Sequence, residues 1–132
     1  EGLKIAIGTA IPINDEEVME VKGRDAVSGL PRIVRIRSNE IADAIKDELI
    51  EIVKAVKGVV HETPPELVSD IIDRGIVLTG GGALLRNLDR LLMDQIGIPC
   101  SVAEEPLLCV AKGTGIALDN LDSYKRSVLS LK

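Results

Sequence analysis

Apolar side chains recur along the chain with two periods, and each period predicts a different kind of element. Residues 19–22 and 34–37 alternate apolar and polar positions, which is typical of strands with one exposed face. The loop between them contains two glycines, so we predict a half-buried hairpin. Residues 40–60 carry apolar side chains at helical spacing and predict one long helix, whose apolar face is formed by Ile41, Ile45, Leu49, Ile52, Val53, Val56 and Val60.

The ends of the helices are marked by recognisable capping residues. Ser38 or Asn39 is expected to cap the long helix. Thr63-Pro64-Pro65-Glu66 has a capping-box pattern with proline near the first helical position, and it predicts a shorter helix that runs to Arg74. Gly75 is expected to end that helix.

The polar face of residues 40–60 is dominated by acidic side chains such as Asp43, Asp47 and Glu51. Helices that lie on membranes are rich in Lys and Arg on this face, so we interpret the long helix as packed on a core. A helix-in-groove site for a partner protein is the alternative.

Residues 75–97 combine a strand, a glycine turn and a helix. Ile76–Leu78 form a short apolar run, Gly80-Gly81-Gly82 follow, and leucines then recur at helical spacing as far as Gly97. Residues without Cβ let a ligand approach the backbone, and a helix start favours negative charge. A phosphate or nucleotide site is one interpretation and a structural tight turn is the other, because neither the P-loop nor the dinucleotide fingerprint is present.

The last third of the chain predicts one more strand and one more helix. Residues 98–102 form a short apolar strand, weakened or placed at an edge by Pro99. A helix is expected to begin near Glu104-Glu105-Pro106. We expect Gly113-Thr114-Gly115 to allow close packing of this helix on the sheet rather than to bind phosphate, since these residues do not follow a strand.

Composition excludes several classes of function. The net charge is −5, and the acidic excess lies in residues 39–132, so neither part of the chain has a basic nucleic-acid footprint. With one Tyr and no Phe or Trp, the chain also lacks aromatic platforms for stacking bases. No apolar run approaches the roughly 18 residues of a membrane span, and we predict a cytosolic protein.

Few residues are candidates for metal binding or acid–base chemistry. Cys100 and Cys109 have no second pair of ligands, and we expect two buried free thiols and no metal site. The single His61 is interpreted as a surface residue. Three hairpin arginines, Arg32, Arg35 and Arg37, could bind phosphate, but we favour cross-strand pairing with Glu17 and Glu20.

Four stretches carry a resemblance to a known family. Gly75–Arg86 contains the run GIVLTGGGALLR, Thr63–Ile71 precedes it, and Glu104–Leu107 and Val110–Gly113 follow it. Together they resemble the MreB family of bacterial actin-like cell-shape proteins. The resemblance implies an α/β, actin-like (ribonuclease H-like) ATPase lobe, covering roughly the C-terminal two-fifths of such a protein, and the chain is accordingly expected to be a fragment.

The resemblance also implies a division of the chain and a set of site residues. Residues 1–38 would be part of the small actin-like subdomain, a helix end plus a hairpin, and residues 39–132 most of the large one. Periodicity alone leaves residues 3–7 as either strand or helix, and the resemblance favours a helix. It implies nucleotide contacts from the sugar-binding pair Glu1 and Lys4 and from the turn residues Gly80, Gly81, Gly82 and Ala83. For Glu1 and Lys4, an ordinary solvent-facing pair is the alternative.

The function implied by the resemblance is that of an ATP-binding, filament-forming protein that maintains rod shape. ATP with Mg²⁺ would be the cofactor of the parent protein, a slow ATPase coupled to polymerisation. The fragment alone would bind nucleotide weakly and hydrolyse none, since no catalytic residue is expected in it. Partners would be further filament subunits, a RodZ-type membrane-anchored adaptor and the cell-wall elongation machinery at the inner face of the cytoplasmic membrane. Alternatives are a lobe of a sugar kinase or of a chaperone-type nucleotide switch.

Overall fold

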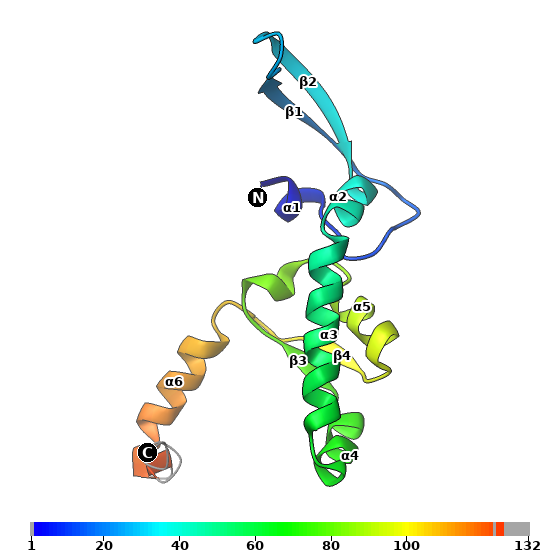
Figure 1. The fold of residues 1–132 in the computed structure, drawn as a ribbon. Coiled ribbons are helices and arrows are strands. Elements are labelled where there is room, and N and C mark those ends of the chain that lie inside the picture. The colour runs from blue at the N-terminus through cyan, green and yellow to red at the C-terminus, as the bar shows by residue number, and fades with distance from the viewer. Residues whose placement is uncertain (1, 123, 126–132) are drawn as a thin grey trace.

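The computed structural model describes residues 2–122, 124 and 125 and shows an α/β arrangement (Figure 1). The helix favoured at residues 3–7 is confirmed as the first element. The elements in chain order are α1 (Gly2–Ile7), β1 (Val18–Arg24), β2 (Pro31–Arg37), α2 (Ser38–Ala44), α3 (Lys46–Glu62), α4 (Pro65–Arg74), β3 (Ile76–Leu78), the 3-10 turn η1 (Gly81–Leu84), α5 (Leu88–Ile96), β4 (Cys100–Val102) and α6 (Cys109–Asp119).

Strands β1 and β2 form the predicted antiparallel hairpin. Its register places Met19 opposite Ile36 and Val21 opposite Val34, so the apolar positions of the two alternating runs face one another. The expectation of half-buried strands is wrong, because only Val21 and Ile36 are partly buried and every other strand residue is exposed. The hairpin projects from the rest of the chain (Figure 1), although β1 contacts α1 and β2 contacts α2.

The hairpin arginines pair with carboxylates, although not always with the predicted ones. Arg35 Nε donates to Glu20 Oε1 at 2.9 Å, which confirms cross-strand pairing. The carboxylate of Glu17 instead binds Arg86, far along the chain. The remaining two arginines use other partners: Arg32 with Asp25 at 3.3 Å and Arg37 with Glu16 at 3.6 Å.

The long helix predicted over residues 40–60 is divided into two. Ile45, at φ −104° and ψ 6°, separates α2 from α3. The change of direction lets Ile41 of α2 be buried near α1 while Leu49 and Val53 of α3 pack against α5. Periodicity misses this break because the apolar spacing continues through it.

The predicted caps of this helix are also wrong. The Glu40 carboxylate accepts the Arg37 N–H at 2.7 Å, so Arg37 occupies the cap position. The Ser38 hydroxyl accepts the Glu17 N–H at 3.2 Å, and the Asn39 side chain exchanges hydrogen bonds with the backbone of Ile13. Both side chains therefore hold the loop before the hairpin instead of the helix start.

The helix expected after Thr63 is confirmed as α4, although its capping box does not form. The Thr63 hydroxyl donates to the Val59 carbonyl at 2.6 Å, and Pro64 takes the cap position without a side-chain hydrogen bond. Gly75 ends α4 as predicted, at φ 80°, and a Cβ there would lie 2.7 Å from the Pro99 carbonyl oxygen. Only glycine fits this close approach without displacing backbone.

A small core joins α3 and α5 to the parallel pair β3 and β4. The Ile76 N–H donates to Pro99 O at 2.8 Å, and β3 then pairs with β4 in parallel. Leu92 is the most deeply buried large side chain, at 2% exposure. The buried cluster around it consists of Ala10, Leu49, Val53 and Leu88.

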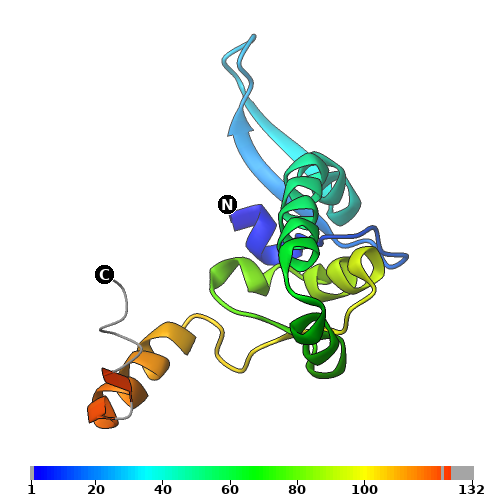
Figure 2. The ribbon, with the colours of Figure 1, turned by 60° about the horizontal axis from the view of Figure 1, so that its bottom comes forward.

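Helix α6 does not pack on the sheet, so that expectation is wrong. It extends away from the other elements in two views (Figures 1 and 2), and none of its residues is buried. A Cβ built at Gly113 or Gly115 would meet nothing within 4 Å. The helix also begins later than predicted, at Cys109, because Glu105 takes a positive φ of 47° and a turn precedes it.

The projecting elements give the chain an unusually large surface. Its accessible area is 10,095 Å², whereas a compact monomer of 14.1 kDa is expected to expose about 6,700 Å². Much of the excess is apolar, with Val110 and Val27 among the most exposed side chains. Among the described helices, none is long and apolar enough to cross a bilayer.

Candidate functional site

The glycine turn after β3 has a backbone that only glycine adopts readily. Gly80 lies at φ 82° and ψ 177°, a region essentially restricted to glycine. Its N–H donates to Pro106 O at 2.8 Å, which ties the turn to the segment before α6. The chain therefore requires glycine at this position for its conformation, whether or not a ligand binds.

The next two glycines present an open backbone. Gly81 and Gly82 are exposed, and a Cβ at Gly82 would meet nothing within 4 Å, whereas one at Gly81 would lie 3.4 Å from Leu107 Cδ2. Among the described residues, neither of their N–H groups donates a hydrogen bond. Two free N–H donors on an uncovered turn are suited to donate hydrogen bonds to the oxygen atoms of an anion. Ala83 differs, because its side chain is 6% exposed and packs inward.

The helix predicted directly after the turn is displaced. Gly81–Leu84 form a single 3-10 turn, Leu85 is extended, and Asn87 takes the left-handed conformation at φ 62° before α5 begins at Leu88. Helix α5 therefore begins at Leu88 and not at the glycine turn. Any attraction for negative charge there must come from the glycine N–H groups and not from a long helix dipole.

The displacement has a cause in the segment that follows the turn. Arg86 leaves the helix path to form an isolated parallel bridge with Thr9, and its carbonyl accepts the Ala10 N–H at 2.8 Å. Asn87 Nδ2 donates to the Thr9 hydroxyl at 2.9 Å, and that hydroxyl donates to Ile11 O at 2.8 Å. Thr9 is completely buried by these contacts.

The Arg86 side chain adds further contacts between the same two segments. Its guanidinium donates twice to the Glu17 carboxylate, at 2.8 and 3.0 Å, and its Nε donates to Gly8 O at 3.1 Å. The hydrogen bonds from Arg86 hold the pKa of Glu17 below its usual value, and the same pairing raises the pKa of Arg86. We call Gly8, Thr9, Glu17, Arg86 and Asn87 the joint.

The joint places α1 beside the glycine turn, as both ribbon views show (Figures 1 and 2). Lys4 lies on α1 and is exposed, and its carbonyl accepts the Gly8 N–H at 3.0 Å. Glu1 lies outside the described residues. The structure therefore brings the helix that carries Lys4 next to Gly80–Ala83, two segments nearly eighty residues apart, while the nucleotide contacts of these residues stay a prediction.

Sequence reasoning missed the joint. Arg86 and Asn87 belong to the quoted motif, but nothing in their spacing indicated a partner, and Glu17 was assigned to the hairpin. Glu17 and Arg86 are 69 positions apart, so no helical or strand period connects them. The one available signal was the polar Arg-Asn pair that interrupts the leucine pattern after the turn.

The other candidate residues behave as surface or packing groups. Both cysteines are free and partly buried, and burial, followed by the charge of Asp89, raises the pKa of the Cys100 thiol. His61 is exposed, as predicted. Within the described part of the chain, no group of three His, Cys, Asp or Glu side chains is placed to hold a metal ion.

Comparisons with known proteins agree over almost the whole chain. The family described as MreB/Mbl protein matches residues 1–126. The cell shape-determining protein Mbl of Bacillus cereus (strain ATCC 10987 / NRS 248) is 50% identical over 129 residues, which cover 98% of this chain and 39% of that protein. The cell shape-determining protein MreB of Escherichia coli (strain K12) is 51% identical over 130 residues, 98% of this chain and 38% of that protein.

Solved structures give the same result. MreB5 of Spiroplasma citri bound to ADP superposes with a TM-score of 0.87 at 36% identity, over 95% of this chain and 38% of that one. The AMPPNP-bound form of MreB5 gives a TM-score of 0.86. The chain thus spans about two fifths of the length of the proteins that it matches, and the predicted α/β actin-like fold is confirmed.

Proposed function

The chain belongs to the MreB/Mbl family, and from this premise we propose that it is part of an ATP-binding, filament-forming protein that maintains bacterial cell shape. The single observation that carries the proposal is the open glycine turn held beside α1 by the joint. The two MreB5 structures are bound to ADP and to AMPPNP. A kinase or chaperone lobe is less well supported, since the relatives are cell shape-determining proteins.

For the nucleotide site, we propose two groups of contacts. Backbone N–H groups of Gly81 and Gly82, with Gly80 and Ala83 setting the shape of the turn, would meet the nucleotide from one side. Glu1 and Lys4 would contact its sugar and base from α1. Support comes from the free, exposed glycine donors and from the position of α1 next to them. Mg²⁺ would enter with ATP, bound to its phosphates.

We propose a division at the junction of β2 and α2, with residues 1–38 in a small subdomain and 39–132 in a large one. Strand β2 ends at Arg37 and α2 begins at Ser38 without an intervening linker. Ser38 is completely buried, so the junction is packed within the protein and is not an exposed linker. The hairpin and α1 would then be carried as one unit on the larger part, with the joint as the second connection between them.

The exposed apolar surfaces are the basis for proposing self-association. Ile33 and Val34 on β2 are 59% and 43% exposed, and as consecutive strand residues they place apolar side chains on both faces of the hairpin. We propose that the hairpin meets a further subunit in a filament. Binding to a RodZ-type adaptor and to the cell-wall elongation machinery, at the inner face of the cytoplasmic membrane, is proposed from the family alone.

Sedimentation of the full-length protein with and without ATP and Mg²⁺ tests this function, beside a Gly82→Val variant. A Cβ at Gly82 meets nothing within 4 Å, so we expect valine there to leave the fold intact while its side chain blocks the approach of a nucleotide. We expect ATP-dependent pelleting of the parent and at least tenfold weaker ATP binding by the variant. Gly81→Val is a less specific test, because a Cβ there would contact Leu107 Cδ2 at 3.4 Å.

Gly58→Val is the matched control, since a Cβ at Gly58 in α3 also meets nothing within 4 Å and lies far from the turn. It should bind ATP and pellet like the parent. A parent protein that binds ATP and stays in the supernatant at all salt concentrations would contradict filament formation. Equal ATP affinity of the parent and Gly82→Val would contradict the assignment of the turn.

A further inference from the structure

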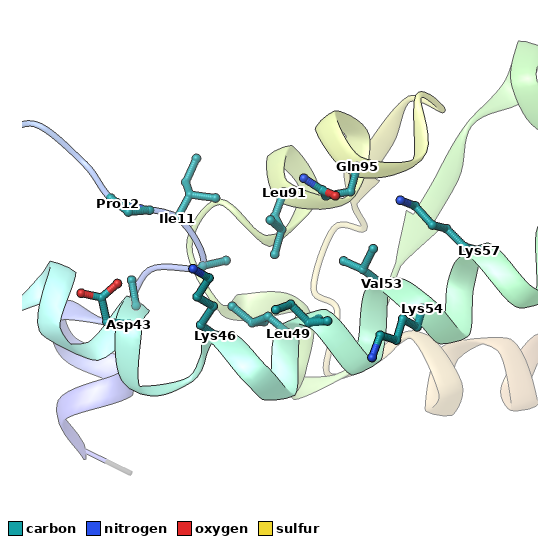
Figure 3. A pocket seen from close by; sticks show the side chains of 13 residues that line it. Ile11, Pro12, Asp43, Lys46, Leu49, Val53, Lys54, Lys57, Leu91 and Gln95 are labelled. Atoms are coloured by element: carbon teal, nitrogen blue, oxygen red, sulfur yellow. The ribbon is translucent and has the colours of Figure 1, made fainter.

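A groove of about 460 Å³ runs along α3, away from the glycine turn. Its walls are α3 on one side and α5 on the other, and residues 10–12 close one end (Figure 3). The volume lies in the range of sites that bury a drug-sized ligand. None of the residues predicted to contact nucleotide lines it.

The floor of the groove is apolar and firmly held. Leu49 and Val53 belong to the buried core, so the floor is the outer surface of packed residues and not a flexible loop. Figure 3 shows Leu91 of α5 facing them across the groove, and Ile11 lies at the closed end. Ile50, at the edge of the groove, is 40% exposed. A preformed apolar floor of this kind reduces the ordering that the protein must undergo when a ligand binds.

The rim carries the opposite charge to the rest of the chain. Lys46, Lys54 and Lys57 line the groove with a single acid, Asp43, although the chain has a net charge of −5. Lys54 is engaged by Glu51 at 2.7 Å. Lys46 and Lys57 make no ion pair with any described residue. In Figure 3 both extend to the side of α3 that faces α5, with Leu49 and Val53 between them.

We propose that this groove binds an acidic amphipathic helix of a partner protein. Lys46 and Lys57 are separated by about 16 Å along α3, or roughly three helical turns. A helix lying along the floor would present apolar side chains at i, i+3 or i+4, and i+7 to Leu49, Val53 and Leu91. Carboxylates near its two ends would then reach the two lysines. The elongated floor with a cation at each end favours a helix over a compact small molecule.

This surface goes beyond nucleotide binding and polymerisation, and its test does not depend on either. A display library of 18-residue helices would be selected on the full-length protein, with apolar residues varied along one stripe and Glu, Gln or Lys allowed at the flanking positions. We expect enrichment of Glu over Lys at the flanks. Fluorescence anisotropy would then give the affinity of the best synthetic peptide.

Charge reversal connects the selected peptide to the groove. In the Lys46→Glu, Lys57→Glu double variant we expect about tenfold weaker binding at 50 mM salt, with a smaller loss at 500 mM because screening weakens the contacts in both proteins. Lys22→Glu on the exposed hairpin is the matched control and should bind like the parent. Ile50→Gln tests the apolar edge and should weaken binding at both salt concentrations.

Three outcomes would overturn the proposal. The first is enrichment of Lys-rich or uncharged helices, or of none above the starting library. The second is equal affinity of the best peptide for the parent and the double variant. The third is tight binding of dodecyl phosphate in the groove without any selected helix, which would identify a site for small amphiphilic anions.

Discussion

The body of the molecule, made of α3, α5, β3 and β4, contains the buried apolar cluster, although Val59 and Val77 within it are exposed. The projections, which are the hairpin and α6, have no buried residue in their strands or helix. Leu92 in the body is 2% exposed, while Ile33 on the hairpin and Ile116 on α6 are 59% and 57% exposed. Both regions nevertheless form regular secondary structure. Backbone pairing and local propensity therefore suffice to define the projections, whereas the body is defined by contacts between distant segments.

The sharpest test of this difference removes one large apolar side chain from each region. Leu92→Ala leaves a cavity in the core, and we expect it to lower the free energy of unfolding by about 3 kcal/mol. Ile33→Ala, on the exposed hairpin, should cost under about 1 kcal/mol. Urea unfolding followed by circular dichroism measures both. A similar loss in the two variants would show that the hairpin is packed in solution.

A second pair of variants compares backbone constraints in the two regions. Gly75→Ala puts a Cβ 2.7 Å from Pro99 O at a φ of 80°, and we expect a loss of about 2 kcal/mol. Gly23→Ala is the control, because a Cβ there meets nothing within 4 Å and the φ of Gly23 is not positive. We expect its urea midpoint to stay the same or to rise slightly. The same urea titration distinguishes them. Tolerance of alanine at Gly75 would contradict the close approach of β3 and β4.

Local signals in the sequence predicted the two hairpin strands and the ends of several helices, but not the exposure of the hairpin and of α6. Alternation predicted two paired strands, which the structure confirms as β1 and β2, and Gly75 and Gly97 end α4 and α5 as expected. Each of these features depends on neighbours within a few residues. The family resemblance, carried by the run around Gly80, added the fold class, which the comparisons confirm.

The remaining features depend on contacts that one sequence does not reveal. The break at Ile45 lets α2 and α3 pack against different elements, although the helical spacing of apolar residues continues through it. The 3-10 turn after Gly80 replaces a helix because Arg86 is drawn to Thr9 and Glu17. Small residues in α6 predicted packing, yet none of them is buried, since residue size shows only that close packing is allowed.

A pH titration compares a carboxylate at the joint with one at the hairpin tip. Arg86 holds the pKa of Glu17 below its usual 4.5, so this pairing contributes stability above that pH and loses it as the pH falls through the lowered pKa. We expect the urea midpoint to drop below pH 4.5 in the parent and less steeply in Glu17→Gln. Equal slopes would show that the pair is not formed in solution.

Asp25→Asn is the control for that titration. Hydrogen bonds from the backbone of Ser28 and Val27, then the side chains of Ser28 and Arg32, hold the pKa of Asp25 below its usual 3.8. Because the tip buries little, we expect faster amide exchange at residues 25–29 without a change in the urea midpoint. A fall in the midpoint would mean that the tip contributes to global stability and is not a separate projection.

The two cysteines give the mildest test of the same comparison, since one lies in each region. Cys100 is in β4 of the body, where burial and then Asp89 raise the pKa of its thiol, and Cys109 begins α6. The thiolate is the reactive form, so Cys100 should react several-fold more slowly than Cys109 with iodoacetamide at pH 8, as mass spectrometry of the two peptides would show. Asp89→Asn should speed Cys100 slightly and leave Cys109 unchanged. Faster labelling of Cys100 would mean that β4 is more accessible to the reagent than the start of α6. That result would contradict the description of the body as the more protected region.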